Sequence, residues 1–182
     1  MILIRFNEIH LKGGNKKYFI KLLHNNIKTA LKDFDCKIED IQNRLVVRDY
    51  NDEEGIVENL KCVFGIHSIS KAVELDNDVD LIEEFVSNIR LDSKTFKCEV
   101  NRADKSFPIK SNDFAARLGE LILKNNKIKV DIHSPETIIY VDIRENGKTV
   151  IFHEIIYAYS GLPLGETRDG VLLLSGGIDS PV

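Results

Sequence analysis

The residues best suited to chemistry lie near the C-terminal end of the sequence, directly after the short apolar run 171–174. They are Ser175, Gly176, Gly177, Ile178, Asp179 and Ser180. Glycines let the backbone approach a phosphate closely, and successive N–H groups and serine hydroxyls can surround an anion. The spacing fits neither a Walker loop nor a dinucleotide-binding turn. The segment therefore predicts a phosphate-binding loop of another kind, and the alternative is a glycine-rich turn without a ligand.

A second set of candidate residues lies between a predicted strand and a predicted helix. Arg102 and Lys105 offer phosphate contacts, and Phe107 offers a flat face for a base or ribose. Lys110 and Arg117 continue the same basic stretch. Taken alone this signal is weak, because a Phe-Pro turn more often packs inward. We nevertheless include all five residues in a predicted RNA-binding surface.

A third set lies near the N-terminus, where a polar break follows the first apolar stretch. Lys12, Lys16 and Lys17 surround Gly13-Gly14-Asn15 and are candidate phosphate contacts. Structurally, the same residues fit an ordinary loop followed by a helix cap. Their assignment to RNA binding therefore depends on the other motifs.

The distribution of charge is compatible with a polyanionic partner, although the formal net charge is −4. Residues 1–49 carry ten Lys or Arg against six Asp or Glu, and residues 94–130 carry nine against four. The acidic excess lies in residues 50–93 and 131–182. Because charges are screened over about 8 Å at physiological salt, a docking polyanion responds mainly to the local patch. The alternative is that these lysines only form solvated helix faces.

The elements that position these residues form two modules. In the first, apolar spacing predicts a strand over residues 1–6, a helix from an Asn15 N-cap to about Asp33, strands over 36–42 and 44–50, and a helix over 52–63. This order is close to a ferredoxin-like arrangement. In the second, the pattern predicts a strand over 66–75, a helix ending near Ile89, a strand over 95–101, a helix over 112–125 and a strand near 130–132.

A hairpin closes the second module. Its predicted arms are residues 137–144 and 149–157, and Asn146-Gly147 occupies the turn, where a positive φ is needed. Glycine and proline then mark residues 160–170 as a linker. The apolar run 171–174 has the pattern of a strand buried on both faces.

Cysteine usage and hydropathy indicate a cytoplasmic protein without membrane segments. Cys36, Cys62 and Cys98 are widely spaced and odd in number, so we interpret them as reduced thiols in the core and expect no metal site. The opening lacks the features of a secretory signal, and no apolar run approaches the roughly 20 residues of a membrane span.

The C-terminal motif resembles the Ser-Gly-Gly-x-Asp-Ser loop of the ATP pyrophosphatase (PP-loop) superfamily, whose members cleave ATP to adenylate a substrate oxygen. The resemblance implies that Ser175, Gly176, Gly177 and Ser180 hold the pyrophosphate end of ATP. It also implies that Asp179 is catalytic, acting through Mg²⁺, and that Leu173 and Leu174 lie at the strand edge beside the nucleotide.

The other two motifs resemble parts of the tRNA 4-thiouridine synthases, also called thiamine biosynthesis sulfurtransferases. The Arg102–Pro108 stretch is similar to the core of a THUMP domain, an RNA-binding module that grips the acceptor end of tRNA. The Glu8–Lys16 stretch is similar to the Gly-Glu-Ile-x-Leu-Lys-Gly-x-Asn-Arg opening of that family, with Asn7 in place of the glycine and Lys16 in place of the arginine. The order of all three motifs carries the resemblance.

The resemblance implies an α+β fold: a ferredoxin-like domain over residues 1–56, a THUMP domain over 57–163, and over 164–182 a linker with the first strand and loop of a Rossmann-like ATP pyrophosphatase domain that is incomplete here. It implies an enzyme that uses ATP with Mg²⁺ to activate uridine 8 of tRNA and inserts persulfide sulfur, and that also supplies sulfur for thiazole synthesis. The implied partners are the acceptor stem and 3′ end of tRNA and a cysteine desulfurase, and a homodimer is left open. The fragment alone is expected to bind tRNA without turnover.

Two other functions remain open at this point. One is the RNA-binding module of a different THUMP-containing enzyme, such as a methyltransferase or pseudouridine synthase. The phosphate-binding loop argues against it, because those reactions do not use a pyrophosphate site. The other is a protein-interaction module whose basic faces are only solvated.

Overall fold

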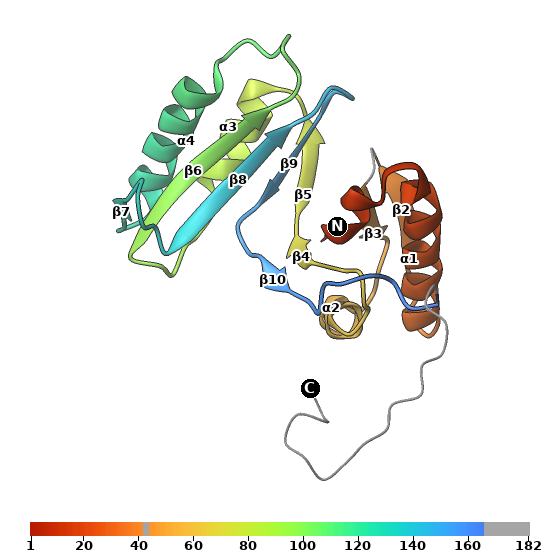
Figure 1. Cartoon of the computed structure of the whole chain (residues 1–182). Helices are drawn as coiled ribbons and strands as arrows, with labels where there is room; N and C mark the ends of the chain where they lie inside the picture. The colour runs from red at the N-terminus through yellow and green to blue at the C-terminus, as the bar shows by residue number, and fades with distance from the viewer. Residues whose placement is uncertain (42–43, 166–182) are drawn as a thin grey trace, which may run out of the picture.

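The computed structural model describes residues 1–41 and 44–165, which form an antiparallel β-sheet and a mixed β-sheet with helices packed on each (Figure 1). The first sheet has the strand order β10-β4-β1-β3-β2, and the second has the order β5-β9-β8-β6-β7. The predicted mixture of helices and strands is thereby confirmed. The predicted strand and loop of the ATP domain, over residues 171–180, lie outside the described residues.

The first sheet and its helices have a ferredoxin-like arrangement, as the sequence predicted. The elements are β1 (Ile2–Arg5), the 3₁₀ helix η1 (Glu8–Asn15), α1 (Lys16–Ala30), β2 (Lys37–Ile41), β3 (Arg44–Arg48), α2 (Glu53–Lys61), β4 (Ser68–Lys71) and β10 (Ile156–Tyr157). All pairs of strands in this sheet are antiparallel.

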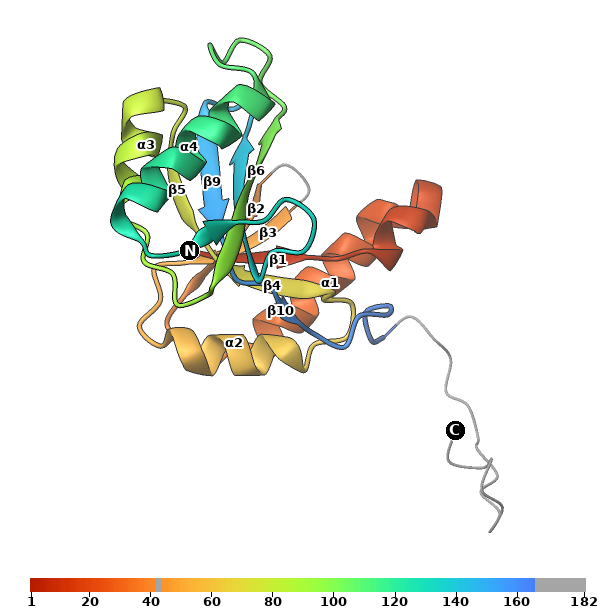
Figure 2. The ribbon, with the colours of Figure 1, turned by 90° about the vertical axis from the view of Figure 1, so that its left-hand side faces the viewer.

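The second sheet is built from the later strands and carries two helices. The elements are β5 (Val73–Asp76), α3 (Val79–Ser87), β6 (Thr95–Arg102), α4 (Ser111–Asn125), β7 (Lys129–Val130), β8 (Thr137–Ile143) and β9 (Lys148–Phe152). Strand β6 runs parallel to β8 and β7, and β9 runs antiparallel to β8 and β5. The α3 and α4 helices cover the same face of this sheet (Figure 2).

Alternation along the strands explains why β1 is apolar throughout. Ile2 and Ile4 point into the core beneath α1 and α2, whereas Leu3 points to the opposite face of the sheet. There Leu3 packs with Val150 and Phe152 of β9. The two sheets therefore face each other, and each carries its helices on the outside. A strand buried on both faces needs apolar side chains at every position.

The side chains of β8 also alternate between two environments. Ile139, Val141 and Ile143 are buried beneath α3 and α4. Tyr140 packs in the cluster between the sheets, and the alternating position Asp142 pairs with Arg44 of the first sheet. The interface between the sheets is thus apolar near β9 and polar near β8.

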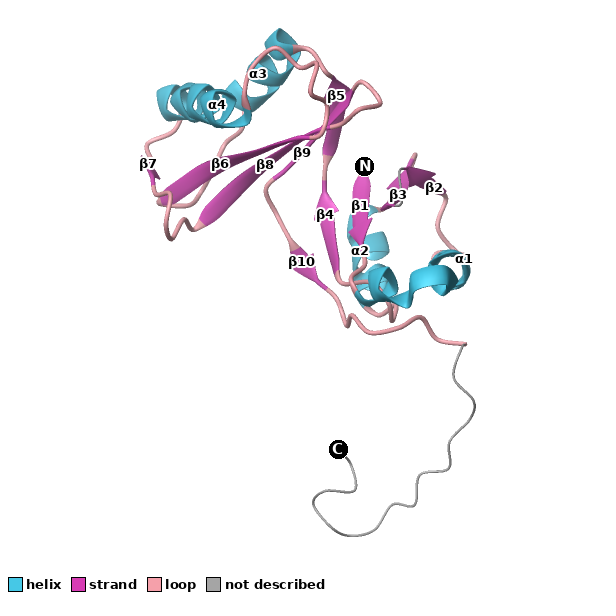
Figure 3. Cartoon of the chain, turned by 45° about the horizontal axis from the view of Figure 1, so that its top comes forward, coloured by secondary structure: helices cyan, strands magenta, loops and turns pink. Residues whose placement is uncertain are grey.

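Two predicted strands are each divided between the sheets (Figure 3). The strand expected over residues 66–75 is broken at Ala72, so that β4 pairs with β1 and β5 pairs with β9. The hairpin arm expected to reach Tyr157 ends at Phe152, and β10 then pairs with β4. Because α2 packs on the first sheet and β4 is one of its strands, we propose that the domain boundary lies at Ala72 rather than at residue 56.

The N-terminus of α1 and the hairpin turn differ in detail from what the sequence predicted. Asn15 precedes α1 at the N-cap position, but its side chain makes no capping hydrogen bond, and the segment before it is 3₁₀-helical. The hairpin turn has Gly147 at φ +75°, while Asn146 is not among the residues with positive φ. Arg144 N donates to Lys148 O over 2.9 Å. The loop thus spans three residues with glycine at the left-handed position.

The cysteines are less buried than the sequence indicated. Cys62 is exposed, and Cys36 and Cys98 are half-buried, so the interpretation of all three as core thiols was wrong for Cys62. All three are free. Burial raises the pKa of the Cys98 thiol to about 12. Within residues 1–41 and 44–165, no helix has the length and apolar character needed to cross a bilayer.

Candidate nucleic-acid interface

The loop between β6 and α4 contains most of the residues predicted to bind RNA, and it is held by its own hydrogen bonds. Arg102 Nη1 donates to Phe107 O at 2.9 Å and to Ile109 O at 3.4 Å. Lys105 Nζ donates to Arg102 O at 3.0 Å. Arg102 is half-buried, and Lys105 is exposed. The guanidinium of Arg102 therefore shapes the loop, and Lys105 is the more accessible cation.

An acidic residue further stabilises this loop. Asp104 Oδ1 accepts hydrogen bonds from the backbone N of Ser106, at 2.9 Å, and from its hydroxyl, at 2.6 Å. These bonds, the hydroxyl first, lower the pKa of Asp104. Asn77 Nδ2 adds a contact to the other carboxylate oxygen at 3.1 Å. The loop that presents Lys105 is thus fixed to the start of α3.

Phe107 does not present a stacking surface, contrary to the prediction. Its side chain is 4% exposed and packs in the core of the second domain. The ring centroid lies 5.2 Å from that of Phe114. The loop folds inward at this point because burial of an aromatic ring is more favourable than its exposure. The ring of Phe107 is therefore not available for stacking in this structure, and its contact with RNA stays a prediction.

Lys110 and Arg117, which lie at and beyond the start of α4, differ in their availability. Lys110 is exposed at the position before the helix and forms no ion pair with the described residues. Arg117 is paired with Glu83 of α3 through both Nε and Nη2, the latter at 2.9 Å. Its side chain remains 52% exposed. An RNA phosphate would have to compete with Glu83 for Arg117, so Lys105 and Lys110 are the freer cations at this end.

The predicted lysines of the first domain lie around the junction of η1 and α1, with Lys12 in η1 and Lys16 and Lys17 in the first turn of α1. Lys12 Nζ lies 5.5 Å from the centroid of the Phe19 ring, as in a cation–π contact. Lys16 is half-buried and Lys17 is exposed. Lys17 and Lys21 line a pocket of about 390 Å³, together with His24 and Asp40. Burial, followed by the charge of Lys28, lowers the pKa of His24.

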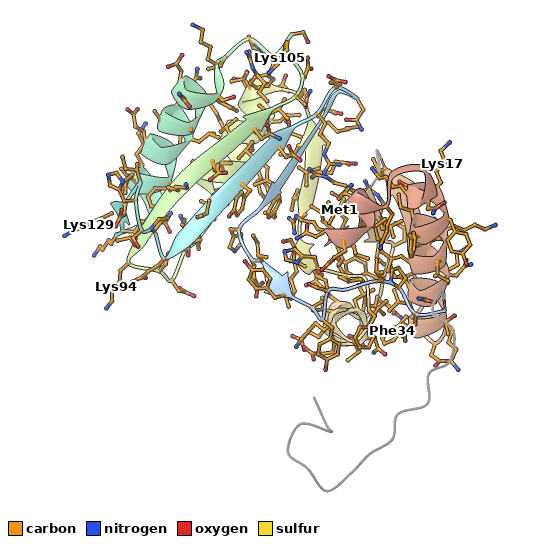
Figure 4. The ribbon with its side chains drawn as sticks, in the orientation of Figure 1. Met1, Lys17, Phe34, Lys94, Lys105 and Lys129 are labelled. Atoms are coloured by element: carbon orange, nitrogen blue, oxygen red, sulfur yellow. The ribbon has the colours of Figure 1, made fainter. Side chains whose placement is uncertain are left out.

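The structure separates the basic block 94–130 into two groups. Lys105 lies at one end of the second domain, whereas Lys94 and Lys129 lie at the other (Figure 4). The latter two are adjacent, since Lys129 N donates to Lys94 O at 3.1 Å. Strand β6 spans the distance between the groups, and its eight residues extend over roughly 26 Å. The residues of this block predicted to bind RNA include neither Lys94 nor Lys129.

Exposed aromatic residues near β10 form a further group that the sequence analysis missed. Phe64 is 44% exposed and stacks on Tyr159 with ring centroids 5.6 Å apart. Tyr157 meets His67 edge-on at 5.7 Å. Exposed aromatic faces can stack on unpaired bases. The alternation of Tyr157 and Tyr159 after the hairpin was the available signal.

The residues assigned to ATP lie outside the described residues. They are Leu173, Leu174, Ser175, Gly176, Gly177, Asp179 and Ser180. In the part of the chain that the structure describes, no group of three or more His, Cys, Asp or Glu side chains is arranged to hold a metal ion. The nucleotide site therefore stays a prediction from the sequence.

Comparison with known proteins gives two domain matches. The family described as "ThiI ferredoxin-like domain" matches residues 1–70, and the family described as "THUMP domain" matches residues 78–152. The boundary between the two matches agrees with the change of sheet at Ala72.

Relatives with curated names match along the whole chain. A probable tRNA sulfurtransferase of Alkaliphilus metalliredigens (strain QYMF) is 42% identical over 192 residues, covering 100% of this chain and 48% of that protein. A probable tRNA sulfurtransferase of Caldanaerobacter subterraneus subsp. tengcongensis is 43% identical over 188 residues, with the same coverage. The chain thus spans about half the length of the relatives it matches.

A solved structure also matches both domains together. The crystal structure of a 4-thiouridine synthetase–RNA complex with bound ATP is 31% identical and has a TM-score of 0.81. The match covers 99% of this chain and 47% of that one. The similarity therefore includes the arrangement of the two domains as well as each fold.

Proposed function

Because this chain belongs to the tRNA sulfurtransferase family, with a ThiI ferredoxin-like domain followed by a THUMP domain, we propose that it is the tRNA-binding part of an enzyme that makes 4-thiouridine. The observation that carries this proposal is the match of both domains, in one arrangement, to a 4-thiouridine synthetase in an RNA complex. In the whole protein, the reaction replaces the 4-oxygen of uridine 8 by sulfur.

The other parts of the proposal concern the whole protein. We assign ATP with Mg²⁺ to the loop at residues 173–180, with Asp179 as the catalytic residue. A cysteine desulfurase is the proposed sulfur donor, and thiazole synthesis is a second use of the sulfur. We propose a cytoplasmic location. None of Cys36, Cys62 and Cys98 is assigned the role of sulfur carrier.

The accessible cations support RNA binding through phosphates rather than through base edges. Lys105 and Lys110 lie at one end of the second domain and are exposed. In the first domain Lys17 is exposed at the start of α1, and Lys12 of η1 and Lys16 of α1 are half-buried. Lysine is a point charge that contacts phosphate without reading sequence. The proposed interface therefore recognises the shape and charge of the tRNA acceptor end.

Titration of tRNA at two salt concentrations tests this function. We expect binding that weakens as salt rises, because each phosphate contact releases counterions. The double variant Lys105→Gln/Lys110→Gln should bind more weakly and lower the salt slope by about two. The matched control is Lys94→Gln/Lys129→Gln, which removes the same charge from the opposite end of the domain and should change affinity less.

Two outcomes would contradict the proposal: no binding at low salt, or equal losses in the two double variants. In the whole protein, Asp179→Ala should abolish thiolation and leave tRNA binding unchanged. Thiolation that persists in Asp179→Ala would remove the loop from the mechanism.

A further inference from the structure

The surfaces that the two sheets turn toward each other carry more positive than negative charge. Arg5 extends from β1 on the same face as Leu3, and Arg44 extends from β3 on the same face as Val46. Arg144 follows β8 of the opposite sheet and is 4% exposed. Three guanidinium groups, each of which stays protonated in proteins, therefore meet at this interface.

One carboxylate, that of Asp142, interacts with two of these arginines. Asp142 Oδ2 lies 2.7 Å from Arg44 Nη1 and 3.5 Å from Arg144 Nε. Its other oxygen accepts a hydrogen bond from Asn101 Nδ2 at 2.8 Å. Both oxygens of the carboxylate are therefore engaged. Its single negative charge is therefore shared among the three arginines.

Several buried donor atoms of these arginines lack an acceptor. Arg5 Nη1 donates to Ser70 Oγ at 3.0 Å, and its guanidinium lies 4.3 Å from the Phe152 ring, but Nη2 is buried without a partner. Arg144 Nη1 and Nη2 are also buried and unpartnered. A buried charged donor without an acceptor is costly, so such groups usually have a partner.

Neighbouring charges do not correct the imbalance. Glu99 borders the same region, but it is 52% exposed and paired with Lys97 at 3.0 Å. Glu74 is paired with Arg48 at 2.8 Å. An excess of about two positive charges therefore remains among the three arginines and Asp142. Burial and then the proximity of Arg44 lower the pKa of Arg5, to about 10, and that of Arg144.

A pocket lies beside these groups, between the two domains. Its volume is about 250 Å³, and its polar walls are formed by Arg5, Arg44, Asn101 and Tyr140 together with the carboxylates of Asp142 and Glu99. Since a water molecule takes up about 30 Å³ in the liquid, the pocket has room for a tetrahedral oxyanion. Guanidinium groups present forked donors that match the oxygens of such an anion.

We propose that this interdomain pocket binds one phosphate group, with Arg5 and Arg44 as the direct contacts and Arg144 supporting them from behind Asp142. A free phosphate ion and a phosphate of an RNA backbone have the same chemistry, so either could occupy the site. The anion would balance the charge between the sheets and fix the orientation of the two domains. The existence of the site does not depend on the proposed tRNA function.

The first experiment measures the thermal unfolding midpoint of the chain while inorganic phosphate replaces chloride at constant ionic strength. Phosphate at ten times its Kd should raise the midpoint by about 3 to 6 °C. The shift should disappear in Arg44→Gln, which removes a guanidinium group from the wall of the pocket. It should persist in Lys32→Gln, an exposed lysine of the first domain that serves as the matched control.

A second variant and a second measurement keep this test decisive. Arg5→Gln should lose the phosphate shift as Arg44→Gln does. Arg5→Gln is the test variant if Arg44→Gln fails to fold. Broadening of the ³¹P signal of phosphate by the wild-type protein, absent with the variants, reports binding independently of stability. No phosphate effect on the wild type, or a phosphate shift in both arginine variants as large as in the wild type, would overturn the site.

The second experiment identifies the source of the phosphate by titrating tRNA into the wild type and Arg44→Gln. If an RNA phosphate occupies the pocket, Arg44→Gln should reduce the salt slope by about one, and inorganic phosphate should compete with tRNA. If Arg44→Gln binds tRNA as the wild type does but has lost the phosphate-dependent shift of the unfolding midpoint, the pocket binds a free phosphate ion. A wild type that responds to phosphate but does not bind tRNA would refute the proposed function and leave the site standing.

Discussion

Residues of the loop after β6 that lie close together in the sequence differ in role, since some hold the loop together and others remain accessible to a ligand. Phe107 fills the core, and Arg102 holds the loop through two carbonyl oxygens, whereas Lys105 and Lys110 stay accessible. The sequence indicated the basic loop correctly. It could not indicate which residues face inward, because a Phe-Pro turn fits either orientation and the arginine's acceptors are backbone atoms with no sequence signature.

Substitution of Phe107 tests its structural role. Phe107→Ala should lower the free energy of unfolding by about 3 to 5 kcal/mol, because it removes a buried ring that packs on Phe114. Denaturant unfolding measures this change. Phe64→Ala, which removes a ring that is 44% exposed, is the matched control and should cost much less. Equal losses would mean that Phe107 is not part of the core.

Most helices and strands were predictable because their periodicity is local. The apolar stripe of α4 and the alternation in β8 each determine one element and its buried face. The breaks at Ala72 and after Phe152 were not predictable in this way. Each run remains extended after the break and only changes its sheet partner, and the partner strands β9 and β4 are distant in the sequence.

The N-termini of α1 and α2 differ in side-chain capping. Asp52 Oδ1 accepts a hydrogen bond from Gly55 N at 2.9 Å at the start of α2, whereas the Asn15 side chain makes no such bond at α1. Asp52→Ala should therefore lower the free energy of unfolding by about 1 kcal/mol. The corresponding Asn15→Ala should have a smaller effect. Chemical denaturation of both variants compares them, and a larger loss for Asn15→Ala would contradict the assigned caps.

The whole molecule is a pair of domains joined face to face by their sheets. Leu3 and Val46 of the first sheet pack with Val150 and Phe152 of the second, and β10 returns the chain to the first sheet. The sequence predicted two modules and the family resemblance predicted their types. The facing of the sheets was not visible in the sequence, since a strand buried on both faces gives no indication of what covers each face.

Cooperativity between the domains follows from this arrangement. The sheet interface buries Phe152, which is 7% exposed, stacks on Tyr140 at 4.8 Å and lies beneath the guanidinium of Arg5. Amide hydrogen exchange should therefore report one shared opening free energy for the most protected amides of both sheets in the wild type. Phe152→Ala should remove contacts from both domains, so that the most protected amides of the two sheets open with two different free energies.

Ile151 provides the matched control, because it lies on the same strand and is 2% exposed but points into the core beneath α3 and α4. Ile151→Ala removes contacts within the second domain and leaves the sheet interface intact, so the most protected amides of both sheets should lose protection together. If Phe152→Ala also lowers both values equally, the domains remain coupled without this ring. Coupling would then have to come from the ion pairs Arg44–Asp142 and Arg48–Glu74, which cross the same interface.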